Sequence, residues 1–183
     1  MCIRDSWKVN RTEIDDFFET ILEYGGNPGV SETPTEIPEN RIPTIIREWP
    51  GLGNPMATGK AGELLNVTRD LGPFVDVNFN GYYEPQFGEY PDIDGDQAIF
   101  WVYNDKGNIH TESGGDAIGL EIQALAFGFT TNDEINDMTF YRYKVTNFAT
   151  TSLDSTYFGQ WVDSDLGAYD LSLRHISEPT RPY

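Results

Sequence analysis

The clearest fold signal in the chain is the run AIGLEIQALAFGFT, residues 117–130. Apolar side chains alternate along this run, and towards its end both faces are apolar. Alternation with a period of two predicts a β-strand, because successive side chains of a strand point to opposite faces of its sheet. A strand that is apolar on both faces is expected to be covered on both sides.

Further strand signals lie on either side of this run. Residues 98–104 (AIFWVYN) indicate a buried strand, and the following DKGN (105–108) predicts a tight hairpin turn. Residues 138–147 (MTFYRYKVTN) alternate again, and residues 157–162 predict another strand. Strands joined by polar turns favour an antiparallel arrangement, so we expect an all-β, sandwich-like domain.

The N-terminal part of the chain has a different pattern. Residues 10–24 predict one helix, because Ile14, Phe17 and Ile21 fall on one stripe and Asn10 is a suitable N-cap. Residues 27–50 contain five prolines and predict an extended connection laid across the domain, with a short helical turn near residues 44–49. The expected domain therefore has one helix and long irregular loops.

An acidic stretch, DVNFNGYYEPQFGEYPDIDGDQ (76–97), precedes the strand at residue 98 and contains no basic residue. Asp76, Asn78 and Asn80 alternate and are followed by Gly81, which matches the first half of a calcium loop. The full helix-loop-helix motif would place a glutamate at residue 87, where this chain has phenylalanine. We therefore predict a looser calcium loop. Its candidate ligands are Asp76, Asn78, Asn80, the carbonyl of Tyr82, Glu84, Glu89, Asp92, Asp94 and Asp96.

The alternative interpretation of this stretch is a solvated acidic turn, held by hydrogen bonds from Asx side chains to nearby backbone. Asp92, Asp94 and Asp96 would either complete the first calcium site or form a second one. Asp163-Ser164-Asp165 is a second acidic turn, for which a plain turn is the favoured interpretation.

The composition excludes several classes of function. The net charge of −18 disfavours nucleic acid and anionic lipid as partners, because both carry negative charge. No apolar run reaches the roughly 18 residues that a membrane span needs. Cys2 is the only cysteine, so the chain has no intramolecular disulfide and no cysteine-based zinc site.

Catalytic signals are few, so the sequence favours a non-enzymatic role. His110 lies next to Thr111 and Glu112, where local hydrogen bonding is the expected role of a single histidine. Paired carboxylates of a glycosidase remain an open alternative, as does carbohydrate binding by exposed aromatic residues. The candidates for stacking on sugars are Trp49, Tyr82, Tyr83, Tyr90 and Trp161.

The two ends of the chain resemble translated sequencing-adapter read-through. The N-terminal piece is MCIRDS (1–6), and the C-terminal piece is LSLRHISEPTRPY (171–183). This resemblance implies that neither piece belongs to the natural domain, which would then span residues 7–170 as one truncated domain.

Residues 74–167 resemble a segment of large secreted or cell-surface proteins of Bacteroidetes, which often carry a type IX secretion sorting domain. The pattern D-x-N-x-D-G-x-Y-x-P-x-x-G-D-Y-P-x-I-x-G-D-Q is matched by residues 76–97, with Asn80 and Glu89 in place of two aspartates. The resemblance implies an extracellular or outer-surface location. It also implies partners among neighbouring domains of the same protein or extracellular glycans and proteins. No activity comes with it.

Overall fold

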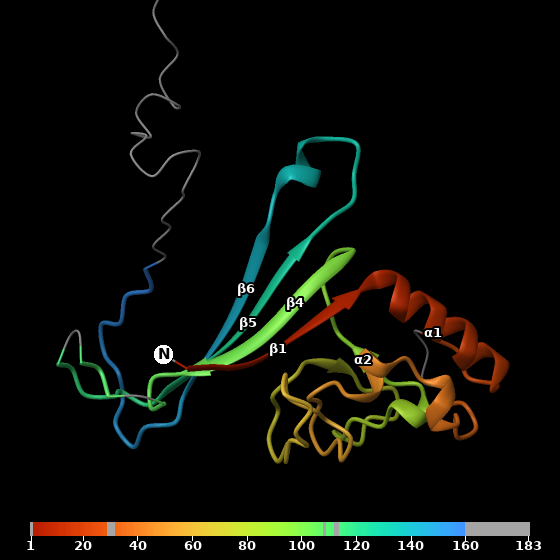
Figure 1. The fold of residues 1–183 in the computed structure, drawn as a ribbon, viewed down its shortest axis with the longest axis horizontal. Coiled ribbons are helices and arrows are strands. Elements are labelled where there is room, and N and C mark those ends of the chain that lie inside the picture. Colours follow the sequence, from red (N-terminus) through yellow and green to blue (C-terminus); the bar gives the residue numbers. More distant parts are fainter. Residues whose placement is uncertain (1, 29–31, 108, 112–113, 160–183) are drawn as a thin grey trace, which may run out of the picture. The chain divides into compact units, whose positions relative to one another are not determined.

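The computed structural model describes residues 2–28, 32–107, 109–111 and 114–159 (Figure 1). Contacts divide the chain into two units, residues 1–150 and 151–183. The strands of the first unit are β1 (Cys2–Asn10), β2 (Phe74–Val75), β3 (Tyr90–Pro91), β4 (Gln97–Asn104), β5 (Leu120–Gly128) and β6 (Phe140–Asn147). Its helices are α1 (Arg11–Glu23) and α2 (Thr44–Arg47), with single turns of 3-10 helix at Glu39–Arg41, Pro85–Phe87 and Glu134–Asp137. In the second unit, residues 151–159 form neither helix nor strand.

The main sheet has the order β1-β4-β5-β6, and each neighbouring pair is antiparallel. A second, two-stranded sheet pairs β2 with β3. The prediction of a mainly antiparallel β-fold is therefore confirmed. Among the described residues no second sheet of comparable size faces the first, so the sandwich itself stays a prediction.

The connection between β4 and β5 differs from the predicted tight hairpin at residues 105–108. The return strand begins only at Leu120, because the carboxylate of Asp105 accepts hydrogen bonds from the backbone N–H groups of Ile118, Gly119 and Leu120. The Asp105 carboxylate thus holds together the two ends of a loop that is longer than predicted. The strand predicted at 157–162 is also not seen: residues 157–159 are irregular, and residues 160–162 lie outside the described part of the chain.

The helix α1 confirms the predicted helix at 10–24 with bounds one residue shorter at each end. Asn10 and Glu13 form a capping box, in which Glu13 accepts from the backbone N–H of Asn10 at 2.8 Å. The predicted stripe of Ile14, Phe17 and Ile21 is buried. Residues 2–6, whose resemblance to adapter sequence had excluded them from the fold prediction, continue β1 along β4.

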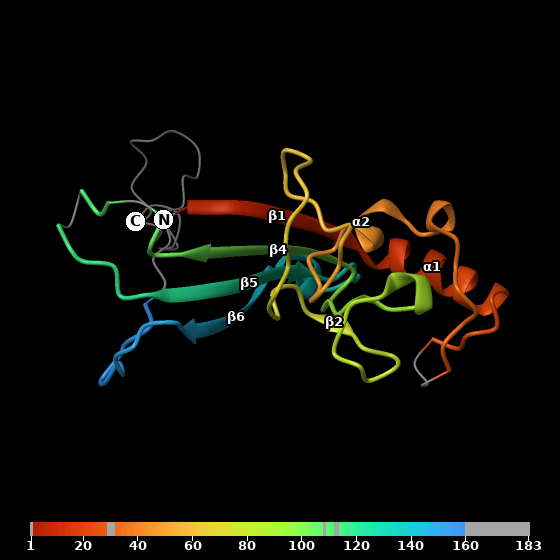
Figure 2. The same ribbon diagram turned by 90° about the horizontal axis from the view of Figure 1, so that it is seen from below.

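An irregular layer, residues 32–96, packs on one face of the main sheet together with α1 (Figure 2). We call these residues the loop layer. Its centre is Trp49, whose ring packs on Trp7 of β1 and Phe100 of β4 with centroid distances of 6.5 and 5.4 Å. The indole N–H of Trp49 donates to the carbonyl of Pro73 at 2.9 Å. The proline-rich connection is therefore part of the core, and the predicted helical turn within it is α2.

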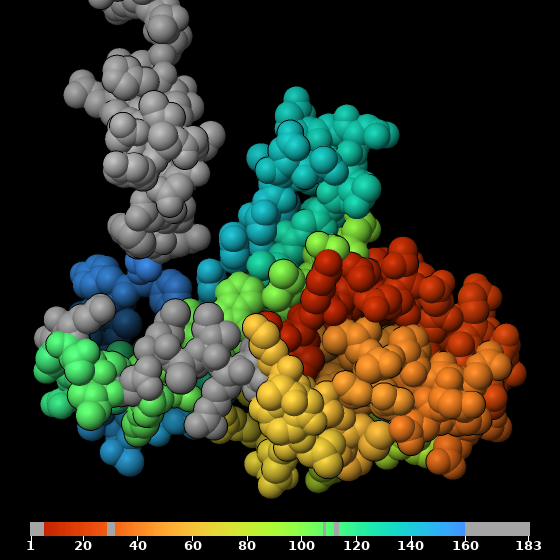
Figure 3. Space-filling model, viewed as in Figure 1, coloured from red at the N-terminus to blue at the C-terminus, as the bar shows by residue number. Residues whose placement is uncertain are grey.

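Ion pairs also hold β5 and β6 to the loop layer. Glu121 of β5 pairs with Arg69, while Lys144 of β6 pairs with Asp70 at 2.6 Å. Beyond the loop layer, the end of the β5–β6 hairpin stands clear of α1 (Figure 3). None of the helices in the described residues is long and apolar enough to cross a membrane.

Candidate functional site

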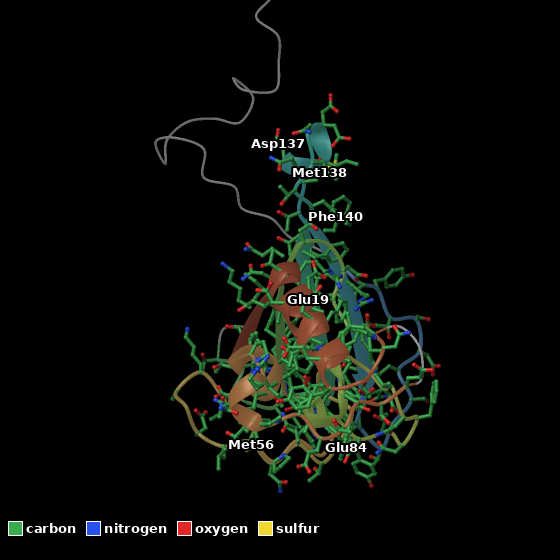
Figure 4. The ribbon with its side chains drawn as sticks, turned by 90° about the vertical axis from the view of Figure 1, so that its right-hand side faces the viewer. Glu19, Met56, Glu84, Asp137, Met138 and Phe140 are labelled. Carbon is green, nitrogen blue, oxygen red and sulfur yellow. The ribbon has the colours of Figure 1, made fainter. Side chains whose placement is uncertain are left out.

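The acidic segment from Asp76 to Glu89 forms a compact loop at the lower edge of the loop layer, where Figure 4 labels Glu84. The loop begins at Asp76, whose two carboxylate oxygens accept from the backbone N–H groups of Asn80 (3.2 Å) and Gly81 (2.8 Å). The backbone can wrap around this carboxylate because Gly81 has a φ of +80°, a left-handed conformation that glycine adopts at little cost. The sequence-predicted turn at Gly81 is therefore present.

The two asparagines of the loop point towards Glu84. The Nδ2 atoms of Asn78 and Asn80 donate to the same carboxylate oxygen of Glu84, at 3.1 and 2.5 Å. Their Oδ1 atoms accept from the backbone N–H groups of Asn80 (3.0 Å) and Tyr82 (2.7 Å). The alternating pattern read from the sequence thus brings amide groups at positions 78 and 80 and a carboxylate at position 84 to one place.

Glu89 closes the loop from below and is fully buried, with 0% of its surface exposed. Its carboxylate accepts from the backbone N–H groups of Glu84 (2.7 Å) and Val77 (3.3 Å). In the described part of the chain it forms no ion pair with a lysine or arginine. Burial, with smaller contributions from the nearby carboxylates of Asp76 and Glu84, raises the pKa of Glu89 to about 7, although its two backbone hydrogen bonds act to lower it.

The loop is tied to the hydrophobic core through Tyr83. This side chain is 2% exposed, its ring packs edge-on against Phe74 at 5.2 Å, and its hydroxyl donates to the carbonyl of Ile46 at 2.7 Å. Burial raises the pKa of Tyr83 well above its usual value, with a further contribution from the charge of Glu89. A change in the charge of Glu89 therefore also changes the electrostatic surroundings of Tyr83, a buried residue of the core.

The side chains of this loop suit a hard cation. Calcium takes about six to eight oxygen ligands from carboxylates, amides, backbone carbonyls and water. Asp76, Glu84 and Glu89 offer carboxylates, and Asn78 and Asn80 offer amide oxygens after a rotation of each amide group. Among the described residues, no three Asp, Glu, His or Cys side chains are already grouped closely enough to hold a metal ion. The amide groups, which now fill the space beside Glu84, would have to turn for an ion to enter.

The second half of the acidic stretch lies elsewhere. Asp94 pairs with Arg142 of β6 at 3.1 Å, and Asp96 accepts from the backbone N–H of Thr130 at 2.6 Å. Asp92 is exposed and its backbone N–H donates to Pro73. These contacts place all three residues beside β5, β6 and the β2–β3 ribbon, so the structure does not join them to the network around Glu84 and Glu89.

The aromatic residues proposed for sugar stacking have other roles. Trp49 and Tyr83 are 0% and 2% exposed, so their assignment to a ligand surface is wrong: both fill the core. Tyr90 is half-buried and packs edge-on against Phe18 at 4.8 Å. Tyr82 is 57% exposed, and Trp161 lies outside the described residues, as does the acidic turn at residues 163–165.

His110 has the local role expected from its sequence context. Its Nε2 lies 2.8 Å from the backbone carbonyl oxygen of Asp105, to which it donates within the β4–β5 loop. Comparison of the chain with family models, with curated proteins and with solved structures found no match. The functional argument therefore rests on the geometry of this molecule.

Proposed function

We propose that this chain is a non-enzymatic, extracellular structural module of a bacterial surface or secreted protein, stabilised by calcium in the loop Asp76–Glu89. The observation that carries the proposal is the burial of Glu89 with no lysine or arginine paired to it among the described residues, next to Glu84, to which both asparagines of the loop donate. A buried carboxylate without a counter-charge opposes folding, because it has lost its hydration. A bound cation would remove this cost.

The position of the loop supports a structural role for the ion. Val77, Tyr83 and Glu89 are buried at its base, so an ion that orders the loop would also hold this part of the loop layer against the sheet. An extracellular location suits such a site, because loops with few charged ligands bind calcium only at the high concentrations found outside cells. The location also follows from the resemblance to secreted Bacteroidetes proteins. We also propose that the complete domain has the sandwich-like β-fold predicted from its sequence.

Calcium titration of metal-stripped protein tests the proposal. At a calcium concentration about 100 times the Kd, binding to the native state alone adds about 2.7 kcal/mol to the free energy of unfolding. For a domain of this size we expect the melting temperature to rise by about 5–10 °C. Magnesium should have a smaller effect, because it requires a more regular octahedron of ligands than an irregular loop offers.

Two substitutions locate the site. Asp76→Asn should abolish most of the calcium-dependent rise, since it removes a carboxylate from the start of the loop. Asp92→Asn is the matched control, because Asp92 belongs to the same acidic stretch but is exposed and lies outside the network. A melting temperature that does not respond to calcium, or an equal loss of the response in both variants, would refute the assignment.

A further inference from the structure

A cleft lies in the surface of the loop layer next to the loop Asp76–Glu89, and we call it the layer cleft. Its lining residues lie between positions 36 and 56 and between positions 82 and 86, and its volume is about 680 Å³. Clefts that bind ligands commonly enclose roughly 300–1,000 Å³. Core residues form its floor, since Ile37, Ile42 and Tyr83 are 1%, 7% and 2% exposed. The layer cleft therefore has an apolar base that the core holds in place.

The charge of the layer cleft is negative. Glu36, Glu39 and Glu84 line it, and among the described residues of its lining Arg47 is the one that is basic. The guanidinium of Arg47 lies 3.4 Å from a carboxylate oxygen of Glu39 and 2.9 Å from one of Glu48, so its charge is compensated twice. Glu36 forms neither an ion pair nor a hydrogen bond within the described part of the chain.

Glu84 provides a second acceptor that the fold leaves unused. One of its carboxylate oxygens accepts from Asn78 and Asn80, and the other has no hydrogen-bond donor among the described residues. A positively charged donor satisfies such carboxylates, whereas an anion is repelled by them and by the net charge of −18. The ring of Tyr82, which is 57% exposed, offers its π face to the same cation. The ligand that fits is an ammonium or guanidinium group on an apolar stem.

A second hollow adjoins the layer cleft and indicates where the rest of the ligand lies. Its volume is about 420 Å³, and it shares Tyr82 and residues 53–55 with the layer cleft. The ring of Tyr82 packs so closely over Gly53 that a Cβ there would lie 2.6 Å from the ring, so this ring is a wall common to both hollows. The apolar residues of the second hollow include Leu52, Leu65 and Val67.

The pair of hollows suits an extended peptide better than a small cation. Alternate side chains of an extended peptide point to the same side at a spacing of about 6.8 Å, so two of them can enter neighbouring hollows. Asn66 and Thr68 are exposed at the second hollow and offer hydrogen-bonding groups to the peptide backbone. We propose that the layer cleft binds an extended segment of a partner protein, with a lysine or arginine in the layer cleft and an apolar side chain two positions away in the second hollow.

This inference goes beyond the structural role and does not require a bound calcium ion. Glu36, Glu39 and the second hollow, apart from Tyr82, lie outside the loop Asp76–Glu89. Binding measurements are therefore made both with calcium and with EDTA. Peptide binding that persists in EDTA supports the layer cleft whatever the outcome of the calcium titration.

Isothermal titration calorimetry with synthetic peptides tests the proposal. The probe is Gly-Ser-Arg-Ser-Leu-Ser-Gly, acetylated and amidated so that the arginine is its one charge. Glutamine in place of the arginine should weaken binding by about tenfold or more, because the carboxylates lose their cation. Serine in place of the leucine should weaken it by about fivefold or more, because less apolar surface is buried. Agmatine, which carries the guanidinium alone, should bind at least about tenfold more weakly than the peptide.

Variants of the protein locate the site. Glu36→Lys places a like charge beside the arginine and should weaken peptide binding by about tenfold or more. Glu134→Lys is the matched control: it makes the same exposed substitution in the turn at the end of the β5–β6 hairpin and should weaken binding by no more than about twofold. Figure 4 shows Asp137 of that turn at the opposite end of the view from Met56 and Glu84. Tyr82→Ala should weaken binding by about fivefold, because both hollows lose their common wall.

Melting temperatures accompany each titration, so that a loss of binding is compared only between folded proteins. Four outcomes would overturn the proposal. The first is no binding of the arginine peptide, or of its lysine counterpart, at millimolar concentration. The second is equal affinity for the arginine and glutamine peptides. The third is an equal loss in Glu36→Lys and Glu134→Lys, which would assign the attraction to net charge. The fourth is agmatine binding as tightly as the peptide, which would assign the cleft to free organic cations.

Discussion

Replacing Glu89 by glutamine separates the charge of this buried side chain from its shape. The pKa of Glu89 is raised from 4.5 to about 7 in the folded protein, chiefly by burial. Between these two pH values the folded state therefore holds a proton that the unfolded state has released. The corresponding stability is fully present below pH 4.5 and is lost as the pH rises through about 7. At about 1.4 kcal/mol for each pH unit, the loss is about 3 kcal/mol.

Glutamine carries no charge and does not titrate, so Glu89→Gln escapes this loss. It has one acceptor oxygen, whereas both oxygens of the Glu89 carboxyl group can accept, protonated or not, from the N–H groups of Val77 and Glu84, so one hydrogen bond worth about 1 kcal/mol is removed. In metal-stripped protein we expect the variant to be less stable than the wild type by about 1 kcal/mol at pH 4. At pH 8 we expect it to be more stable by about 2 kcal/mol.

Urea unfolding followed by tryptophan fluorescence measures both differences in the free energy of unfolding. The other acidic residues contribute the same pH dependence to both proteins, so their contributions cancel in the difference. Saturating calcium at pH 8 should reverse the order, because the ion compensates the charge of Glu89 and finds no such charge in the variant. A difference between the two proteins that is the same at pH 4 and pH 8 would refute the raised pKa. Equal stabilisation of both proteins by calcium would show that Glu89 is not part of the ion site.

Three further predictions concern the fold and use the same urea assay. Gly95→Ala should cost more than about 2 kcal/mol, because Gly95 has a φ of +70° and a Cβ would lie 2.4 Å from the carbonyl oxygen of Gly128. Gly81→Ala has a similar φ of +80° but open space around it, so in metal-stripped protein it should cost only about 1 kcal/mol, and equal losses would contradict the steric argument. Asp105→Ala leaves three backbone N–H groups at the end of the β4–β5 loop without their acceptor, so it should lower the free energy of unfolding by about 2–3 kcal/mol. A loss below about 0.5 kcal/mol, which is typical of a surface substitution, would show that the loop closes without the Asp105 carboxylate. Leu125→Ala opens a cavity in the core beside Phe100 and should cost about 3 kcal/mol, whereas a near-neutral result would mean that β5 is not packed as described.

The strands and the helix could be predicted because their signals are local. A run of mostly apolar residues placed β4, period-two alternation placed β5 and β6 within a few residues, and the stripe of Ile14, Phe17 and Ile21 placed α1. The strands β1, β2 and β3 were not predicted. The β4–β5 connection was predicted wrongly. The DKGN sequence favours a tight turn, but the path of the chain is decided by hydrogen bonds between residues that are distant in sequence. The Asp105 carboxylate binds N–H groups at least 13 residues away, and no local pattern contains that information.

The candidate site was predicted in part for the same reason. The alternation of Asp76, Asn78 and Asn80 is local, and in the structure both asparagines donate to Glu84, whose backbone N–H donates to Glu89. Their role as calcium ligands stays a prediction. Composition could not predict which aromatic residues would be buried and which would be exposed. Trp49 is buried because distant residues of β1 and β4 meet it, whereas Tyr143 is half-exposed because charged neighbours on its strand turn inwards.

The acidic stretch divides into two halves that differ in how their charge is compensated. In the second half, Asp94 is paired with Arg142, and Arg11 donates to the carbonyls of Ile93 (2.7 Å) and Gly95 (3.4 Å). In the first half, Glu89 is buried near the carboxylates of Asp76 and Glu84, and no lysine or arginine in the described part of the chain is paired with it. A chain with 12 basic and 30 acidic residues cannot pair every carboxylate, and among the described residues Glu89 is a fully buried carboxylate with no lysine or arginine paired to it. We therefore propose the first half of the stretch as the place where calcium binds, whereas Asp94 in the second half already has its counter-charge in Arg142.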